Sequence, residues 1–99
     1  MVVNQRNDLL ISKSILEQRL KVSVKGFIYW QTLCARLKQE EESYWSMHQE
    51  LWCKGEWDES YYSGIQQNVW DASRQIGRYQ YEINHCTEEL DKIKKRLGL

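Results

Sequence analysis

The chain contains no proline, and only five of its 99 residues are glycine. Proline in the interior of a helix costs about 3 kcal/mol, and glycine about 1 kcal/mol relative to alanine. A chain that lacks the first residue and has little of the second can form long, uninterrupted helices. Its length is enough for one domain, or for one half of a symmetric dimer.

A surplus of charge of either sign is also absent, because fourteen basic side chains are balanced by fourteen acidic ones. Nucleic-acid-binding proteins draw much of their affinity from excess lysine and arginine, so the balance counts against this class. No apolar run approaches the roughly 20 residues needed to cross a bilayer. The N-terminal segment lacks the apolar core of a signal peptide. We therefore expect a soluble protein without membrane contact.

Cysteine is scarce, odd in number and without any close pair. We expect free thiols in a reducing compartment, which points to the cytoplasm. Spacings among Cys34, Cys53, Cys86, His48 and His85 match no zinc-binding pattern, so no metal is expected. No glycine-rich phosphate loop and no catalytic constellation is present either. The sequence predicts neither a cofactor nor an enzyme.

The C-terminal third carries the clearest pattern. Its apolar residues recur at alternating steps of three and four, which is typical of a long helix with a narrow seam for another helix. We call these residues the C-terminal seam: Tyr62, Ile65, Val69, Ala72, Ile76, Tyr79, Ile83, Cys86, Leu90, Ile93 and Leu97.

The preceding segment carries a second seam with the same spacing. It consists of Leu16, Leu20, Ser23, Phe27, Trp30, Cys34, Leu37, Glu41, Tyr44, His48 and Leu51. Ile11, Ile15 and Val22 form an additional stripe beside this N-terminal seam. The first helix is therefore apolar over a wider arc than one partner helix requires, and we expect it to contact more than one helix.

Two arrangements of the N-terminal part are open. Val22, Val24 and Gly26 weaken the helical pattern, yet the seam keeps its phase through them. The first interpretation is one helix from about Asp8 to about Cys53, kinked or straight at residues 22–26. The alternative is a break near Gly26 and a three-helix bundle.

The best turn comprises residues 54–58, where Gly55 can end one helix and Asp58 can cap the next, over about 59–97. The sequence thus predicts an all-α, coiled-coil-like antiparallel hairpin forming a single domain over residues 1–99. The register expected from this turn pairs Cys34 with Gly77, within about one turn. Because a lone hairpin has little core, we expect two copies to form a homodimeric bundle.

Five tryptophans and six tyrosines exceed what a thin bundle can bury. Such rings are enriched in binding hot spots, although they could equally close the hairpin tip or fill a dimer core. The candidate partner-binding residues, either near the turn or off the seam, are Trp45, Trp52, Trp57, Tyr61, Trp70 and Tyr81.

The function that these features favour is that of a small protein-binding module. It would be an inhibitor, adaptor or regulator, such as a phage or mobile-element accessory factor, that contacts a protein partner stoichiometrically. The alternative is a nucleic-acid-associated helical dimer that uses the basic helix end at residues 92–96.

Overall fold

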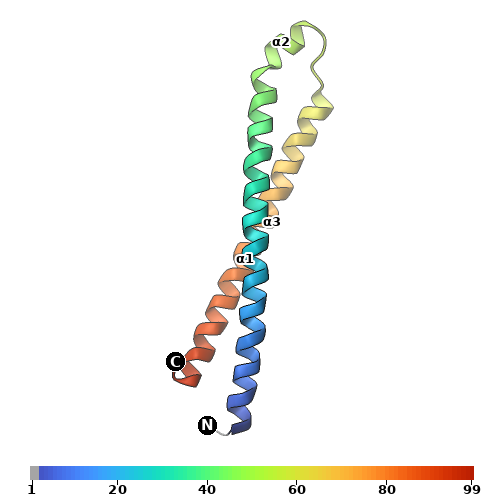
Figure 1. Ribbon diagram of the computed structural model, residues 1–99. Coiled ribbons are helices and arrows are strands. Elements are labelled where there is room, and N and C mark those ends of the chain that lie inside the picture. Colours follow the sequence, from blue (N-terminus) through green and yellow to red (C-terminus); the bar gives the residue numbers. More distant parts are fainter. Residues whose placement is uncertain (1–2) are drawn as a thin grey trace. The chain divides into compact units, whose positions relative to one another are not determined.

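The computed structural model describes residues 3–99, and Met1 and Val2 lie outside this part. Three helices follow one another, α1 (Val3–Ser46), α2 (His48–Cys53) and α3 (Glu59–Leu97), and no strand occurs within residues 3–99. Figure 1 shows the short α2 at the turn between the two long helices. The long helices α1 and α3 pack against each other, which confirms the predicted all-α helical hairpin.

The chain divides into two compact units, each built from a piece of α1 and a piece of α3. Unit 1 comprises the chain up to Phe27 and from Gly77 onward, and unit 2 comprises Ile28–Ile76. Within unit 2, Cys34 meets Ser73 and Glu41 meets Tyr62, so the helices run antiparallel.

The predicted seams form the contact between the long helices. Every residue of the C-terminal seam is at least partly shielded from solvent, and six are buried: Ile65, Ala72, Cys86, Leu90, Ile93 and Leu97. From α1, Ser23 and Cys34 are buried. Several of these side chains are small, so the core holds few large apolar groups.

Helix α1 continues through Gly26, and the break required by the three-helix alternative does not form. The glycine instead accommodates Tyr79 of α3 within unit 1, since a Cβ atom at position 26 would lie 2.6 Å from the ring Cζ. The sequence analysis treated Gly26 as a weak point because the partner ring is 53 residues away along the chain.

The interruption in the helical chain lies at Met47 instead. Its φ of −95° and ψ of 2° leave the helical region, and its N–H donates to the Tyr44 carbonyl oxygen three residues earlier, at 3.1 Å. Helix α1 therefore ends at Ser46, before the expected Cys53. At its other end it begins at Val3, before the expected Asp8. Residues 48–53 form α2.

Both ends of the connection to α3 use local capping. Gly55 adopts a φ of 71°, and Glu56 N–H donates to the Leu51 carbonyl oxygen at 2.8 Å, as in a Schellman motif. Asp58 Oδ1 accepts a hydrogen bond from Tyr61 N–H at 3.0 Å, so Asp58 is the predicted N-cap of α3.

The register agrees with the expected one to within about one helical turn. Cys34 lies beside Ser73, with 3.6 Å between Sγ and Oγ, rather than beside Gly77. The offset of four residues arises because α1 already ends at Ser46, so that residues 47–58, centred before residue 56, separate the two long helices.

Candidate functional site

Seven ring-bearing side chains gather around the connection in unit 2. We call them the aromatic cluster: Tyr44, Trp45, His48, Trp52, Trp57, Tyr61 and Tyr62. Trp57 lies at its centre and is only partly exposed. Its ring centroid is 4.5 Å from that of Tyr44, 4.4 Å from that of His48 and 5.3 Å from that of Tyr62. These contacts come from α1, α2 and α3, so Trp57 joins all three helices.

The outer rings of the cluster face solvent. Trp45 is 53% exposed, Trp52 is 66% exposed and Tyr61 is 49% exposed. Each is nevertheless held by another ring: Trp45 stacks on His48 at 4.6 Å, and Trp52 lies 5.9 Å from His48. The cluster therefore presents exposed aromatic rings that are held in place by contacts with other rings of the cluster.

Hydrogen bonds from tyrosine hydroxyls fasten α3 to α1 at the cluster. Tyr61 Oη donates to Glu40 Oε1 at 3.0 Å, and Tyr62 Oη donates to Glu41 Oε1 at 3.5 Å. The hydrogen bond to Glu40 raises the pKa of Tyr61, while partial burial, with Glu41 adding to it, raises the pKa of Tyr62. Neither hydrogen bond is apparent from the sequence, since each tyrosine follows its glutamate by 21 residues.

Two further hydrogen bonds hold the connection itself. Asp58 N–H donates to Tyr44 Oη at 3.1 Å. The indole Nε1 of Trp57 donates to Glu59 Oε2 at 2.9 Å. The segment between α2 and α3 is thus anchored at both Trp57 and Asp58, which keeps the central ring in place.

Charge is segregated in a way that the neutral total conceals. Unit 1 contains ten basic and six acidic side chains, whereas unit 2 contains four basic and eight acidic ones. Residues 40–59, around the aromatic cluster, contain seven acidic side chains and the single base Lys54. The exposed rings are therefore surrounded by carboxylates.

The structure places the six predicted site residues in three locations. Trp45, Trp52, Trp57 and Tyr61 belong to the aromatic cluster. Trp70 is 57% exposed in unit 2, and the Arg74 guanidinium carbon lies 4.8 Å from its ring centroid. Tyr81, 72% exposed, belongs to unit 1.

Of the other rings of the cluster, the sequence analysis placed Tyr44 and His48 on the N-terminal seam and Tyr62 on the C-terminal seam. It did not identify the central position of Trp57 or the stacking of His48 between tryptophans. The available signal was their density: seven ring-bearing residues fall between Tyr44 and Tyr62.

The three cysteines differ in their exposure to solvent. Cys34 and Cys86 are buried, Cys53 is exposed and all three are free thiols. Within residues 3–99, no three His, Cys, Asp or Glu side chains converge on a point where a metal ion could bind.

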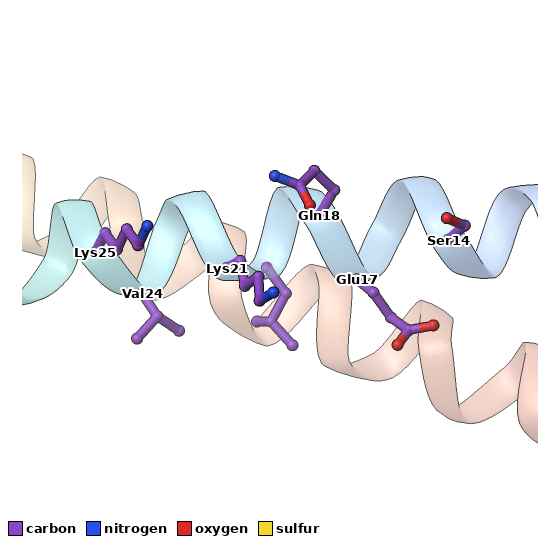
Figure 2. A pocket seen from close by; sticks show the side chains of 7 residues that line it. Ser14, Glu17, Gln18, Lys21, Val24 and Lys25 are labelled. Atoms are coloured by element: carbon purple, nitrogen blue, oxygen red, sulfur yellow. The ribbon is translucent and has the colours of Figure 1, made fainter.

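A hollow of about 650 Å³ is lined by seven α1 residues between Ser14 and Lys25 (Figure 2). Its acidic side chain, Glu17, is paired with Lys13 at 2.8 Å, and this hydrogen bond lowers the pKa of Glu17. Because a single helix lines the hollow and its carboxylate is engaged, the hollow presents ordinary helix surface.

Comparisons with protein-family models, curated proteins and solved structures give no significant match. No helix in the described part of the chain combines the length and the apolar character that a membrane span requires.

Proposed function

We propose that this protein binds a partner protein stoichiometrically through the exposed rings of the aromatic cluster, as an inhibitor, adaptor or regulator. The observation that carries the proposal is the exposure of Trp45, Trp52 and Tyr61 around a partly buried Trp57. Rigid, amphipathic rings lose little conformational entropy on binding, and tryptophan and tyrosine dominate interface hot spots. The exposed free thiol of Cys53 fits a reducing compartment such as the cytoplasm.

The charge around the cluster specifies the chemistry of the partner. Seven acidic side chains against one base create a negative potential over residues 40–59. Complementary potentials steer association and suppress wrong partners. The partner surface should therefore present lysine or arginine around apolar pockets that receive Trp45 and Trp52.

A photo-crosslinking amino acid at position 52 tests the proposal directly, because it captures whatever protein touches that ring in the source cell. The captured partner is then purified and titrated against the wild type and a Trp45→Ala/Trp52→Ala variant. We expect one-to-one binding, weakened at least roughly thirtyfold in the variant. Trp70→Ala is the matched control, since it removes an exposed tryptophan of the same unit outside the cluster. Equal loss in both variants, or none in either, would contradict the proposal.

A second candidate function rests on the charge of unit 1. The basic surplus of unit 1, which includes Lys92, Lys94, Lys95 and Arg96 near the end of α3, favours contact with nucleic-acid phosphates. Lys94→Glu/Lys95→Glu separates the two functions. It should weaken nucleic-acid binding and reduce its salt dependence, while leaving binding through the aromatic cluster unchanged.

A further inference from the structure

The face of α1 in unit 1 that carries the extra apolar stripe is not covered by any other part of residues 3–99. Ile11 is 59% exposed, Ile15 is 56% exposed and Val22 is 58% exposed. Figure 2 shows Gln18, which falls on this stripe, projecting from the edge of α1 opposite Glu17 and Val24. Three large β-branched residues on one helix face are costly to leave in water, so the face needs a partner.

The order of residues on this face is symmetric. Asp8, Ile11, Ile15, Gln18, Val22 and Lys25 follow one another at steps of three, four, three, four and three. The steps read the same in both directions. Two copies laid antiparallel therefore superimpose the pattern on itself, with each pair of facing residues adding up to 33.

This antiparallel alignment also matches the side chains. Ile11 faces Val22 of the second copy, and Ile15 faces its Gln18. At both ends Asp8 faces Lys25, which gives two pairs of opposite charge. A parallel alignment would instead place Asp8 beside Asp8 and Lys25 beside Lys25, and like charges in such positions are destabilising. The charges therefore select the antiparallel orientation.

A groove on the same face has the form that such a partner requires. It measures about 420 Å³ and its wall includes Ile15, Gln18, Arg19 and Val22. These residues stand at positions i, i+3, i+4 and i+7, the four that form the hole for one inserted side chain in a coiled coil. Ser23 and Glu82 complete the groove, and Glu82 forms an ion pair with Arg19 that fixes one side.

We infer that residues 8–25 of α1 form an isologous, antiparallel interface with a second copy of this chain, in which Ile15 of each copy inserts into the groove of the other. A two-fold axis then passes between residues 16 and 17, and both grooves are filled at once. The inference is independent of the proposed function, because the interface lies in unit 1 and the aromatic cluster lies in unit 2.

Cysteine crosslinking tests the register. Cys53→Ser removes the exposed thiol, while Cys34 and Cys86 are buried. In that background, a mixture of Ile11→Cys and Val22→Cys chains should form a disulfide-linked heterodimer under mild oxidation. Each variant alone should remain unlinked, because like residues of the two copies lie roughly 16 Å apart along the helix axis, beyond disulfide reach.

Oligomeric state tests the interface itself. Ile15→Lys should weaken dimerisation by roughly a hundredfold in sedimentation equilibrium, at unchanged helix content. Leu10→Lys, which charges an exposed apolar residue on another face of α1, should change it by less than about threefold. Asp8→Lys and Lys25→Asp should each weaken it by roughly fivefold, and the double exchange should restore it.

Three results would overturn the inference. The first is self-linking of Ile11→Cys as fast as the mixture, which would mean a parallel pair. The second is equal weakening by Leu10→Lys and Ile15→Lys. The third is a monomeric mass up to about 1 mM protein, which would leave the face to a different partner.

Discussion

The phenol ring of Tyr79 lies directly against the backbone of Gly26, in the space that a Cβ atom would occupy. This contact lets α1 and α3 approach closely within unit 1. It also explains a glycine in the middle of a 44-residue helix, where alanine would otherwise be preferred. The two residues should therefore respond to substitution as a pair.

Gly26→Ala should lower the free energy of unfolding by up to about 2 kcal/mol, because overpacking against the Tyr79 ring outweighs the gain of about 1 kcal/mol in helix propensity. Gly77→Ala is the matched control, since a Cβ atom there meets no neighbour within 4 Å. The free energy of unfolding of Gly77→Ala should rise by about 1 kcal/mol. Urea denaturation followed by circular dichroism measures both. Stabilisation by Gly26→Ala in the wild type, as well as in a Tyr79→Ala background, would contradict the pairing.

Acid should weaken unit 1 through Glu82. Its hydrogen bond with Arg19 holds the pKa of Glu82 below the ordinary value of 4.5. A lowered pKa in the folded state contributes stability that is present above pH 4.5 and is lost as the pH falls through the lower, folded-state pKa. Glu82→Gln should therefore melt at a lower temperature than the wild type at neutral pH, and the difference should shrink as the pH falls below 4.5.

Glu88→Gln is the control for the acid series. Glu88 is exposed and has no ion-pair partner in the described part of the chain. The melting temperature of Glu88→Gln should follow that of the wild type at every pH. A gap between wild type and Glu82→Gln that stays constant from neutral to acid pH would show that the ion pair does not stabilise unit 1.

Trp57→Ala should destabilise unit 2 by about 2–3 kcal/mol, because it removes the central ring from a cluster in which four others contact it. Trp52→Ala removes an equally large but exposed ring and should cost less than about 0.5 kcal/mol. Denaturation curves and near-ultraviolet circular dichroism separate the two. Equal costs would mean that Trp57 does not hold the cluster together.

The Tyr61 phenol should ionise late in an alkaline titration, because its hydrogen bond to Glu40 raises its pKa. The raised pKa means that the contact stabilises the fold below the ordinary pKa of 10 and that this contribution is lost as the pH rises further. Glu40→Gln should shift one tyrosine to lower pH in the ultraviolet absorbance of phenolate. Tyr61→Phe should abolish that shift. A titration unaffected by Glu40→Gln would exclude the contact in solution.

The helical hairpin could be predicted because its signal is periodic and repeated. The C-terminal seam repeats over five heptads without a proline, and every one of its residues is shielded in the structure. Caps are local signals as well, and the roles of Gly55 and Asp58 follow from their own residue types. Features of this kind depend on residues that lie close together in the sequence.

Features that depend on distant residues could not be predicted. Met47 has no helix-breaking character, and the chain turns there where His48 packs against both Trp52 and Trp57. Gly26 looked like a weak point because its partner, Tyr79, belongs to the other long helix. The candidate site could be predicted only in part for the same reason. The density of rings near the turn is a local signal, whereas the stacking of the rings depends on the register between the helices.

The isoelectric point is near 6.7, yet the two units carry opposite net charges. Each unit should therefore interact with charged surfaces of the opposite sign. A protein of zero net charge is ordinarily expected to pass through ion-exchange resins at neutral pH. This chain should instead be retained at low salt on both kinds of resin, since unit 1 carries a formal +4 and unit 2 a formal −4. The orientation in which it is immobilised, and hence the surface left free for a partner, is set by the choice of matrix.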